Sequence, residues 1–185
     1  MPQAGTAFAE VDTPGSFIWA SSQLSVTSGA SMSLLQELMN QAANGSLLQP
    51  QLISRFSATE IRESIQQLVA TEQTDLAYAL GDAGMSLYPN SEDMLAINGL
   101  LAIMRQEWQQ AVDLLEELTQ LQGEQTQPFT YVMLVRALRC NLEPARALET
   151  VRKGLKAYPD QLELVAESLA LDDFSDAMSS TGQSH

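Results

Sequence analysis

The chain has 185 residues, 45% of them apolar, which is enough for one domain with a buried core. Its 23 acidic and 9 basic residues give a net charge of −14. A field of this sign repels phosphate groups, so nucleic acid and anionic membranes are excluded as expected partners. Basic or apolar protein surfaces remain as partners, and a merely well-solvated surface is the alternative interpretation of the charge.

The composition offers few groups for catalysis or metal binding. Cys140 is the only cysteine, and His185 is the only histidine and the last residue. The chain therefore lacks a residue required for intrachain disulfides, thiolate clusters, Ser–His and Cys–His pairs and histidine-ligated zinc. We expect no enzyme activity, no catalytic residue, no metal and no cofactor. Cys140 is expected to be a buried, inert thiol at a helix end, with a reactive thiol beside Arg136 and Arg139 as the alternative.

Two further absences bear on location. No run of apolar residues approaches the 18 or so that cross a membrane, and the first basic residue is Arg55. A secretory signal would need a positively charged start ahead of its apolar segment. We therefore expect a cytoplasmic protein that does not insert into membranes.

The N-terminal part divides into two segments. Residues 1–30 are rich in Ala, Ser, Thr and Gly without a sustained period, and we expect a disordered leader. Residues 31–56 are expected to hold an amphipathic helix over 31–44 and a linker. A helix this short is unstable alone in water, so it must pack on something. Its apolar stripe consists of Leu34, Leu35, Leu38, Met39 and Ala42.

A helical domain is predicted over residues 57–171, beginning with two clear start signals. Ser57-Ala-Thr-Glu60 matches a capping box, in which Ser and Glu each bond the other's backbone amide. Thr74-Asp75 opens a second helix that runs to Leu87, and Asn90 or Ser91 caps a third. The period of apolar residues supports helices throughout this part.

The remaining helices follow at short intervals. A fourth is predicted from Glu107 to Leu121, and Pro128 and Pro144 suit the first positions of a fifth and a sixth. A seventh is predicted over residues 162–171. Residues 172–185 are expected to be a disordered tail. The fold class is all-α, with antiparallel hairpins joined by short links.

The sequence contains a weak internal repeat. The segments DLAYALGDAGMSLYP (75–89) and ARALETVRKGLKAYP (145–159) place Ala, Gly and Tyr-Pro at the same offsets, 70 residues apart. A third copy centred between them contains EWQQAVDLLEEL. Aligning Ala77, Ala111 and Ala147 gives repeats of 34 and 36 residues, close to the 34-residue tetratricopeptide period.

These residues resemble the tetratricopeptide family. Its small residue at the hairpin contact corresponds to the three aligned alanines, its large anchor to Ile61, Leu95 and Tyr131, and its turn proline to Pro89 and Pro159. The family's Leu-Gly pair is replaced by Asn98-Gly99 in the middle copy and is missing from the others. The resemblance implies three hairpins stacked in a short solenoid with a C-terminal capping helix.

A more specific likeness concerns residues 97–148. This stretch is similar to the small tetratricopeptide chaperones of bacterial type III secretion, which bind needle subunits, through Gly99, Arg105, Trp108 and Ala111 and the helix that ends at Cys140. The resemblance implies protein transport, virulence and a secretion subunit as the bound partner. Residues 1–56 have no counterpart in it.

The tetratricopeptide resemblance also implies a binding surface, because the first helix of each hairpin lines a concave groove in that family. An amphipathic partner helix would lay its apolar side on Leu, Ile, Met and Phe side chains, and arginines would hold its carboxylates. A register error of one would instead place these apolar side chains in the core. The expected partner-binding residues are Arg62, Gln66, Val69, Leu100, Ile103, Met104, Phe129, Val132, Arg136 and Arg139.

Two functions fit this surface. The first is a chaperone or adaptor that shields a helical secretion subunit, and which we expect to self-associate as a homodimer when the cargo is absent. The second is a scaffold component of a larger assembly with no chaperone role, expected to be a stable monomer. A further hypothesis places residues 31–44 in the groove until cargo displaces them.

Overall fold

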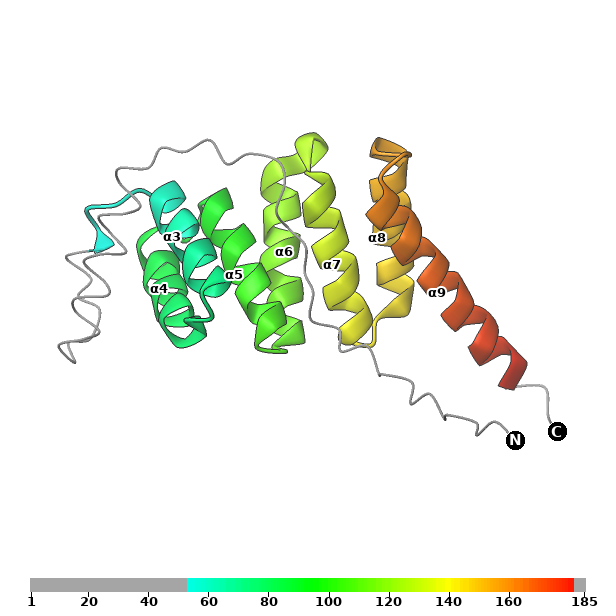
Figure 1. Cartoon of the computed structure of the whole chain (residues 1–185). Helices are drawn as coiled ribbons and strands as arrows, with labels where there is room; N and C mark the ends of the chain where they lie inside the picture. Colours follow the sequence, from blue (N-terminus) through cyan, green and yellow to red (C-terminus); the bar gives the residue numbers. More distant parts are fainter. Residues whose placement is uncertain (1–52, 182–185) are drawn as a thin grey trace, which may run out of the picture.

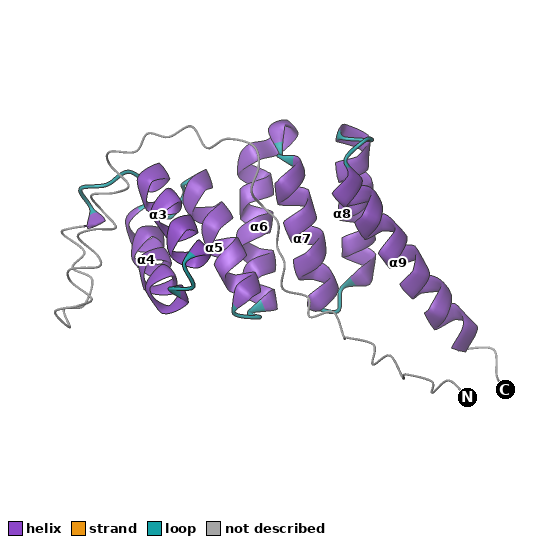
Figure 2. Cartoon of the chain, viewed as in Figure 1, coloured by secondary structure: helices purple, strands orange, loops and turns teal. Residues whose placement is uncertain are grey.

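The computed structural model describes residues 53–181, with side chains to Asp172, and this part of the chain is helical without a strand (Figures 1 and 2). The predicted all-α fold is confirmed as a tetratricopeptide-like stack with a C-terminal helix. The predicted leader and the helix over 31–44 lie outside the described residues. The elements are α3 (Ala58–Ala70), α4 (Thr74–Leu87), α5 (Glu92–Met104), α6 (Trp108–Gln122), the short 3₁₀ helix η1 (Gly123–Gln125), α7 (Pro128–Cys140), α8 (Pro144–Ala157) and α9 (Leu162–Thr181).

Three helices begin at residues that deal with the unpaired backbone N–H groups of a first turn. These residues either accept a hydrogen bond from such a group or, in the case of proline, have no N–H. Ser57 donates its backbone N–H to Glu60 Oε2 at 2.8 Å, and the Glu60 amide donates to Ser57 Oγ, so the capping box is complete. Pro128 and Pro144 open α7 and α8, where a missing N–H has no consequence. Ser91 occupies the cap position of α5, but its side chain makes no capping hydrogen bond.

The expected boundary of the domain at Leu171 is wrong. Helix α9 continues to Thr181, so residues 172–181 are helical rather than the start of a disordered tail. Leu164, Glu167 and Leu171 bury one side of α9 and hold its first turns. No Gly or Pro follows until Gly182, so extending an established helix requires no new nucleation.

Each hairpin turns on one residue in the left-handed region, at the same place in the repeat. Glu72, Gln106 and Leu142 have φ of 60°, 62° and 61°. The next amide closes the turn in each case, with Gln73, Glu107 and Glu143 donating to the carbonyls of Leu68, Ala102 and Leu138 at 2.9 Å. These turns are 34 and 36 residues apart, so the structure confirms the alignment of the three alanines.

The hairpins close around small residues. Ala77, Ala111 and Ala147 are all completely buried, as their alignment predicts. Gly99 lies so close to α6 that a Cβ there would be 2.8 Å from Leu115 Cδ2. Gly154 is similarly placed against Tyr131 and Leu164. The result is a row of hairpins running from α3–α4 to α7–α8, with α9 packed on the last one (Figure 1).

Candidate partner-binding groove

The first helices of the hairpins form one continuous layer. Helix α3 packs on α5, α5 on α7, and α7 on α9, while α4, α6 and α8 pair with them to form the other layer. All ten residues predicted for the groove belong to α3, α5 and α7. Consecutive first helices run in the same direction, because each is separated from the next by one reversing helix.

The structure divides the predicted apolar residues into exposed and buried ones. Phe129 and Met104 are 41% and 36% exposed, and Val69 and Ile103 are half-buried. Leu100 is 9% exposed and Val132 only 2%, so both belong to the hydrophobic core. A partner would therefore touch Phe129 and Met104 first, and Val132 offers it almost no surface.

The two exposed side chains lie near opposite ends of this layer. Phe129 is the second residue of α7, whereas Met104 is the last residue of α5, which runs in the same direction. About eleven helical residues separate these levels, which corresponds to roughly 16 Å along the helix axes. A ligand that contacts both must run along the layer, and a helix of three turns is long enough.

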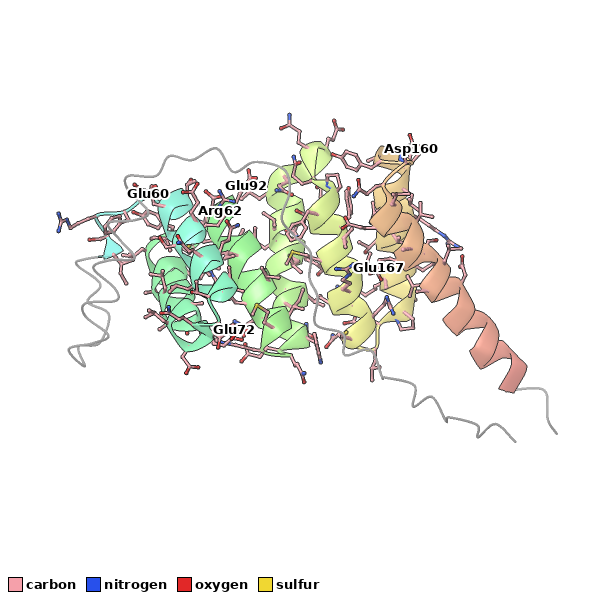
Figure 3. All side chains as sticks on the ribbon, viewed as in Figure 1. Glu60, Arg62, Glu72, Glu92, Asp160 and Glu167 are labelled. Atoms are coloured by element: carbon pink, nitrogen blue, oxygen red, sulfur yellow. The ribbon has the colours of Figure 1, made fainter. Side chains whose placement is uncertain are left out.

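Arg62 joins the first two hairpins. Its Nε lies 2.9 Å from Asp93 Oδ1 of α5, although the N–H is not aligned for a hydrogen bond, so the contact is an ion pair. Thr59 donates a hydrogen bond to the other oxygen of the same carboxylate at 2.6 Å. Gln66, the remaining predicted residue of α3, is half-buried one turn further on. Figure 3 shows Arg62 at the side of α3 that faces α5.

Arg136 and Arg139 together hold Glu167 of α9. Arg136 Nε donates to Glu167 Oε1 at 2.6 Å, and Arg139 Nη1 donates to Glu167 Oε2. Glu167 is only 7% exposed, whereas the two arginine side chains remain about two-fifths exposed. The predicted arginines therefore bind a carboxylate, but it belongs to this chain. Figure 3 labels this residue, Glu167.

Glu167 was missed at the sequence level, although a signal for it was present. In the repeat alignment Glu167 corresponds to Ile97 and Met133, which are 2% and 3% exposed. An acidic residue at a position that is otherwise apolar and buried requires a positively charged partner. The only cations one helix earlier in that layer are Arg136 and Arg139.

Cys140 is exposed, which corrects the expectation of a buried thiol. It is the last residue of α7 and aligns with Met104 of α5, so both end their helices at the same level. The chain then enters the left-handed turn at Leu142, which begins the reversal into α8. The side chain of Cys140 therefore lies at the margin of the layer rather than in the core.

A second cluster of charges joins the outer helices. Arg146 of α8 reaches Glu116 of α6 and also pairs with Glu143 one turn earlier. The hydrogen bonds from Arg146 and Asn141 hold the pKa of Glu143 below its usual range, and Glu143 and Glu116 raise the pKa of Arg146. These groups are on the surface, so they stabilise the stack only modestly.

Within residues 53–172, no group of three His, Cys, Asp or Glu side chains is arranged to hold a metal ion. No helix among the described residues is long and apolar enough to cross a membrane.

No protein-family model matches the chain, and no curated protein matches it. Two solved structures of MamA mutants are similar in fold. The "MamA RS-1 ArsTM double mutant" has a TM-score of 0.59 at 14% identity, over 82% of this chain and 88% of that one. A second mutant of MamA has a TM-score of 0.57 at 15% identity, over 79% of this chain and 88% of that one.

The "Assembly Chaperone of RpL4 (Acl4)" has a TM-score of 0.50 at 14% identity, over 83% of this chain and 61% of that one. MamA and Acl4 are tetratricopeptide-like helical repeat proteins. Similarity at this level of identity establishes the fold alone.

Proposed function

We propose that the protein is a non-catalytic chaperone or adaptor that binds an amphipathic helix of a partner protein along the layer formed by α3, α5 and α7. The observation that carries this proposal is the exposure of Phe129 and Met104 at the two ends of this layer, with half-buried Ile103 and Val69 beside them. Exposed apolar side chains on one face of a helical stack suit the apolar side of a partner helix.

The arginines have a more limited part in this proposal than the apolar side chains. Arg62, Arg136 and Arg139 flank the groove, but Arg62 already pairs with Asp93, and Arg136 and Arg139 share the single carboxylate of Glu167. A carboxylate of the partner would have to share them with, or displace, a carboxylate of the chain. We therefore assign most of the affinity to Phe129, Met104 and Ile103, and assign orientation of the partner to the arginines.

The class of partner is proposed from sequence resemblance. Residues 97–148 resemble the type III secretion chaperones, so a secretion subunit is the proposed cargo. Acl4, whose fold is similar, is described as an assembly chaperone, and this supports a chaperone role in general but not a particular cargo. A scaffold in a larger assembly is the competing function.

Purification of the tagged full-length chain from the organism that encodes it tests the proposal. A chaperone should carry one partner in a fixed ratio, and the free partner should aggregate when the chain is removed. A scaffold should carry several proteins, each of them stable without it. A chain that carries no stoichiometric protein would contradict both functions.

The groove itself is tested with the purified partner and a dye attached to Cys140. This cysteine is exposed and ends α7 at the level of Met104, so a thiol-reactive fluorophore there reports on occupancy of this end. Binding of the partner should change the emission, and Phe129→Asp should weaken the change although it lies at the far end. A partner that binds without altering the emission and without sensitivity to Phe129 would place the site elsewhere.

A further inference from the structure

Helix α9 exposes an apolar stripe made of Leu162, Val165 and Leu169. These side chains are 81%, 36% and 62% exposed and recur at helical spacing, so they lie on one face. The opposite face carries Leu164, Glu167 and Leu171, which pack on α7 and α8. The stripe is separate from the groove residues of α3, α5 and α7.

The repeat register identifies what this face is built to contact. Tyr88-Pro89 and Tyr158-Pro159 align the segments that follow them, which places Val165 at the position of Leu95 and Leu169 at that of Gly99. Gly99 packs on Leu115 of α6, the second helix of its own hairpin. In the neighbouring hairpins, Ile61 contacts Gly84 of α4 and Tyr131 contacts Gly154 of α8.

Val165 and Leu169 therefore lie on the face that a second helix covers in each of the three hairpins. Leu95 is 1% exposed and Ile65, which aligns with Leu169, is completely buried. Among the described residues no second helix follows α9, so this face of a fourth, half-formed hairpin is left open. An amphipathic helix antiparallel to α9 would complete it.

The charges on the second helices indicate which kind of helix would fit the open face of α9. Glu116 of α6 forms an ion pair with Arg146 of the next second helix. In the repeat alignment Arg152 of α8 occupies the position of Glu116, with the opposite charge. Arg152 has no ion pair within the described part of the chain, and the helix expected beside it should therefore carry acidic residues.

Helix α9 itself combines an exposed apolar stripe with exposed acidic residues. It carries Glu163 and Asp172, which are both exposed, and Asp172 lies beside the stripe. The stripe is also close to symmetrical about Val165, so two copies related by a two-fold axis would place Leu162 of one opposite Leu169 of the other. The two helices of a hairpin pack antiparallel, and a two-fold axis through Val165 would likewise make the two copies of α9 antiparallel.

We propose that two copies of this chain associate through α9. Each α9 serves as the second helix of the fourth hairpin of the other copy, and Arg152 faces the acidic flank of that helix. Both requirements of the open face, an apolar stripe and acidic neighbours, are met by a second copy. Residues 31–44 have the apolar stripe but only one acidic residue, Glu37. This inference does not depend on the proposed groove, since the two surfaces share no residue.

Sedimentation velocity of the full-length chain over a range of concentrations tests the proposal. The wild type should reach twice the monomer mass, and Leu169→Asp should weaken the dimer by about tenfold or more, since it places a charge in an apolar contact. Leu142→Asp is the matched control, because Leu142 is 85% exposed at a hairpin turn, and it should leave the dimer unchanged. Circular dichroism checks that both variants are folded.

The charge is tested separately with Arg152→Glu. This exposed substitution should weaken the dimer by about threefold, which is the scale of a surface ion pair, and Asp172→Lys should restore part of the loss. Arg55→Glu, an exposed arginine before the first hairpin, is the control. Because Arg152 is an exposed residue of α8, the loss of dimer in Arg152→Glu does not depend on whether a substitution in α9 disturbs the fold.

A cysteine at the proposed two-fold axis gives a direct geometric readout. In a Cys140→Ser background, Val165→Cys should form a disulfide-linked dimer on mild oxidation, whereas Ala145→Cys on α8 should not. A wild type that stays monomeric would overturn the proposal, as would a dimer insensitive to Leu169→Asp and Arg152→Glu. A dimer lost on Leu38→Asp but kept in Arg152→Glu would overturn it in favour of residues 31–44.

Discussion

The hydroxyl of Tyr158 donates a hydrogen bond to the backbone carbonyl of Thr126, 32 residues earlier, at 3.0 Å. Tyr88 does the same to Phe56, also 32 residues earlier, at 2.8 Å. In both hairpins the tyrosine follows the second helix and its acceptor precedes the first, so the bond closes the open end of the hairpin. The Tyr-Pro repeat found in the sequence thus has a physical cause.

Tyr158→Phe should lower the free energy of unfolding by about 1 kcal/mol, because it removes one half-buried hydrogen bond and leaves the Thr126 carbonyl unpaired. The measurement is urea denaturation followed by circular dichroism. Tyr78→Phe is the control, since the Tyr78 ring stacks under Arg105 at 4.1 Å and its hydroxyl makes no hydrogen bond with the described residues. Equal losses in the two variants would show that the bond does not stabilise the hairpin.

Leu142→Gly should stabilise the protein. Leu142 has a φ of 61° and is 85% exposed, so its side chain gains little from packing and strains the backbone. Relative to Leu142→Ala, which keeps the strain, the glycine variant should be about 1 kcal/mol more stable. A thermal unfolding comparison of the two variants decides the matter, and an alanine variant as stable as the glycine variant would contradict the explanation.

Glu167→Gln should destabilise the attachment of α9 to α7. The substitution leaves Arg136 and Arg139 without the carboxylate that both bind, and we expect a loss of about 2 kcal/mol, moderated because the arginines are partly exposed. Hydrogen exchange should show faster opening of α9 while α3–α6 keep their protection. Glu163→Gln, an exposed neighbour, should have no such effect, and unchanged protection of α9 in Glu167→Gln would refute the assignment.

The capping box at Ser57 and Glu60 should make the free energy of unfolding depend on pH in the acidic range. The Ser57 backbone amide and then its hydroxyl donate to Glu60 and hold the pKa of this carboxyl below its usual value. The stabilisation is fully present above the unfolded pKa of about 4.3 and is lost as the pH falls through the lower folded pKa. The difference in unfolding free energy between the wild type and Glu60→Gln should therefore shrink towards acidic pH, and a constant difference would contradict it.

Much of the fold could be predicted from local patterns. Helix starts at Ser57, Pro128 and Pro144 depend on residues next to one another in the chain, and the structure has them where expected. The alignment of Ala77, Ala111 and Ala147 identified the repeat because the hairpin contact admits only small residues. The left-handed turns at Glu72, Gln106 and Leu142 could not be predicted, since none of the three is Gly or Asn.

The candidate site was less predictable, because exposure depends on neighbouring helices. Leu100 and Val132 are as apolar as Ile103 and Phe129, and the packing of the neighbouring helices decides which of them are covered. The arginines presented the same difficulty. Their charge pointed to a bound carboxylate, but the choice between a partner and Glu167 depends on where α9 packs.

The most direct test of the account is the affinity of the purified partner for four proteins: the wild type, Phe129→Asp, Met104→Asp and Leu121→Asp. Leu121 is 49% exposed on α6, outside the groove, and so is the matched control. Titration calorimetry should show a loss of about tenfold or more for each groove variant and almost none for Leu121→Asp. Equal affinities for all four, or a loss confined to Leu121→Asp, would contradict the claim that the α3–α5–α7 layer binds the partner.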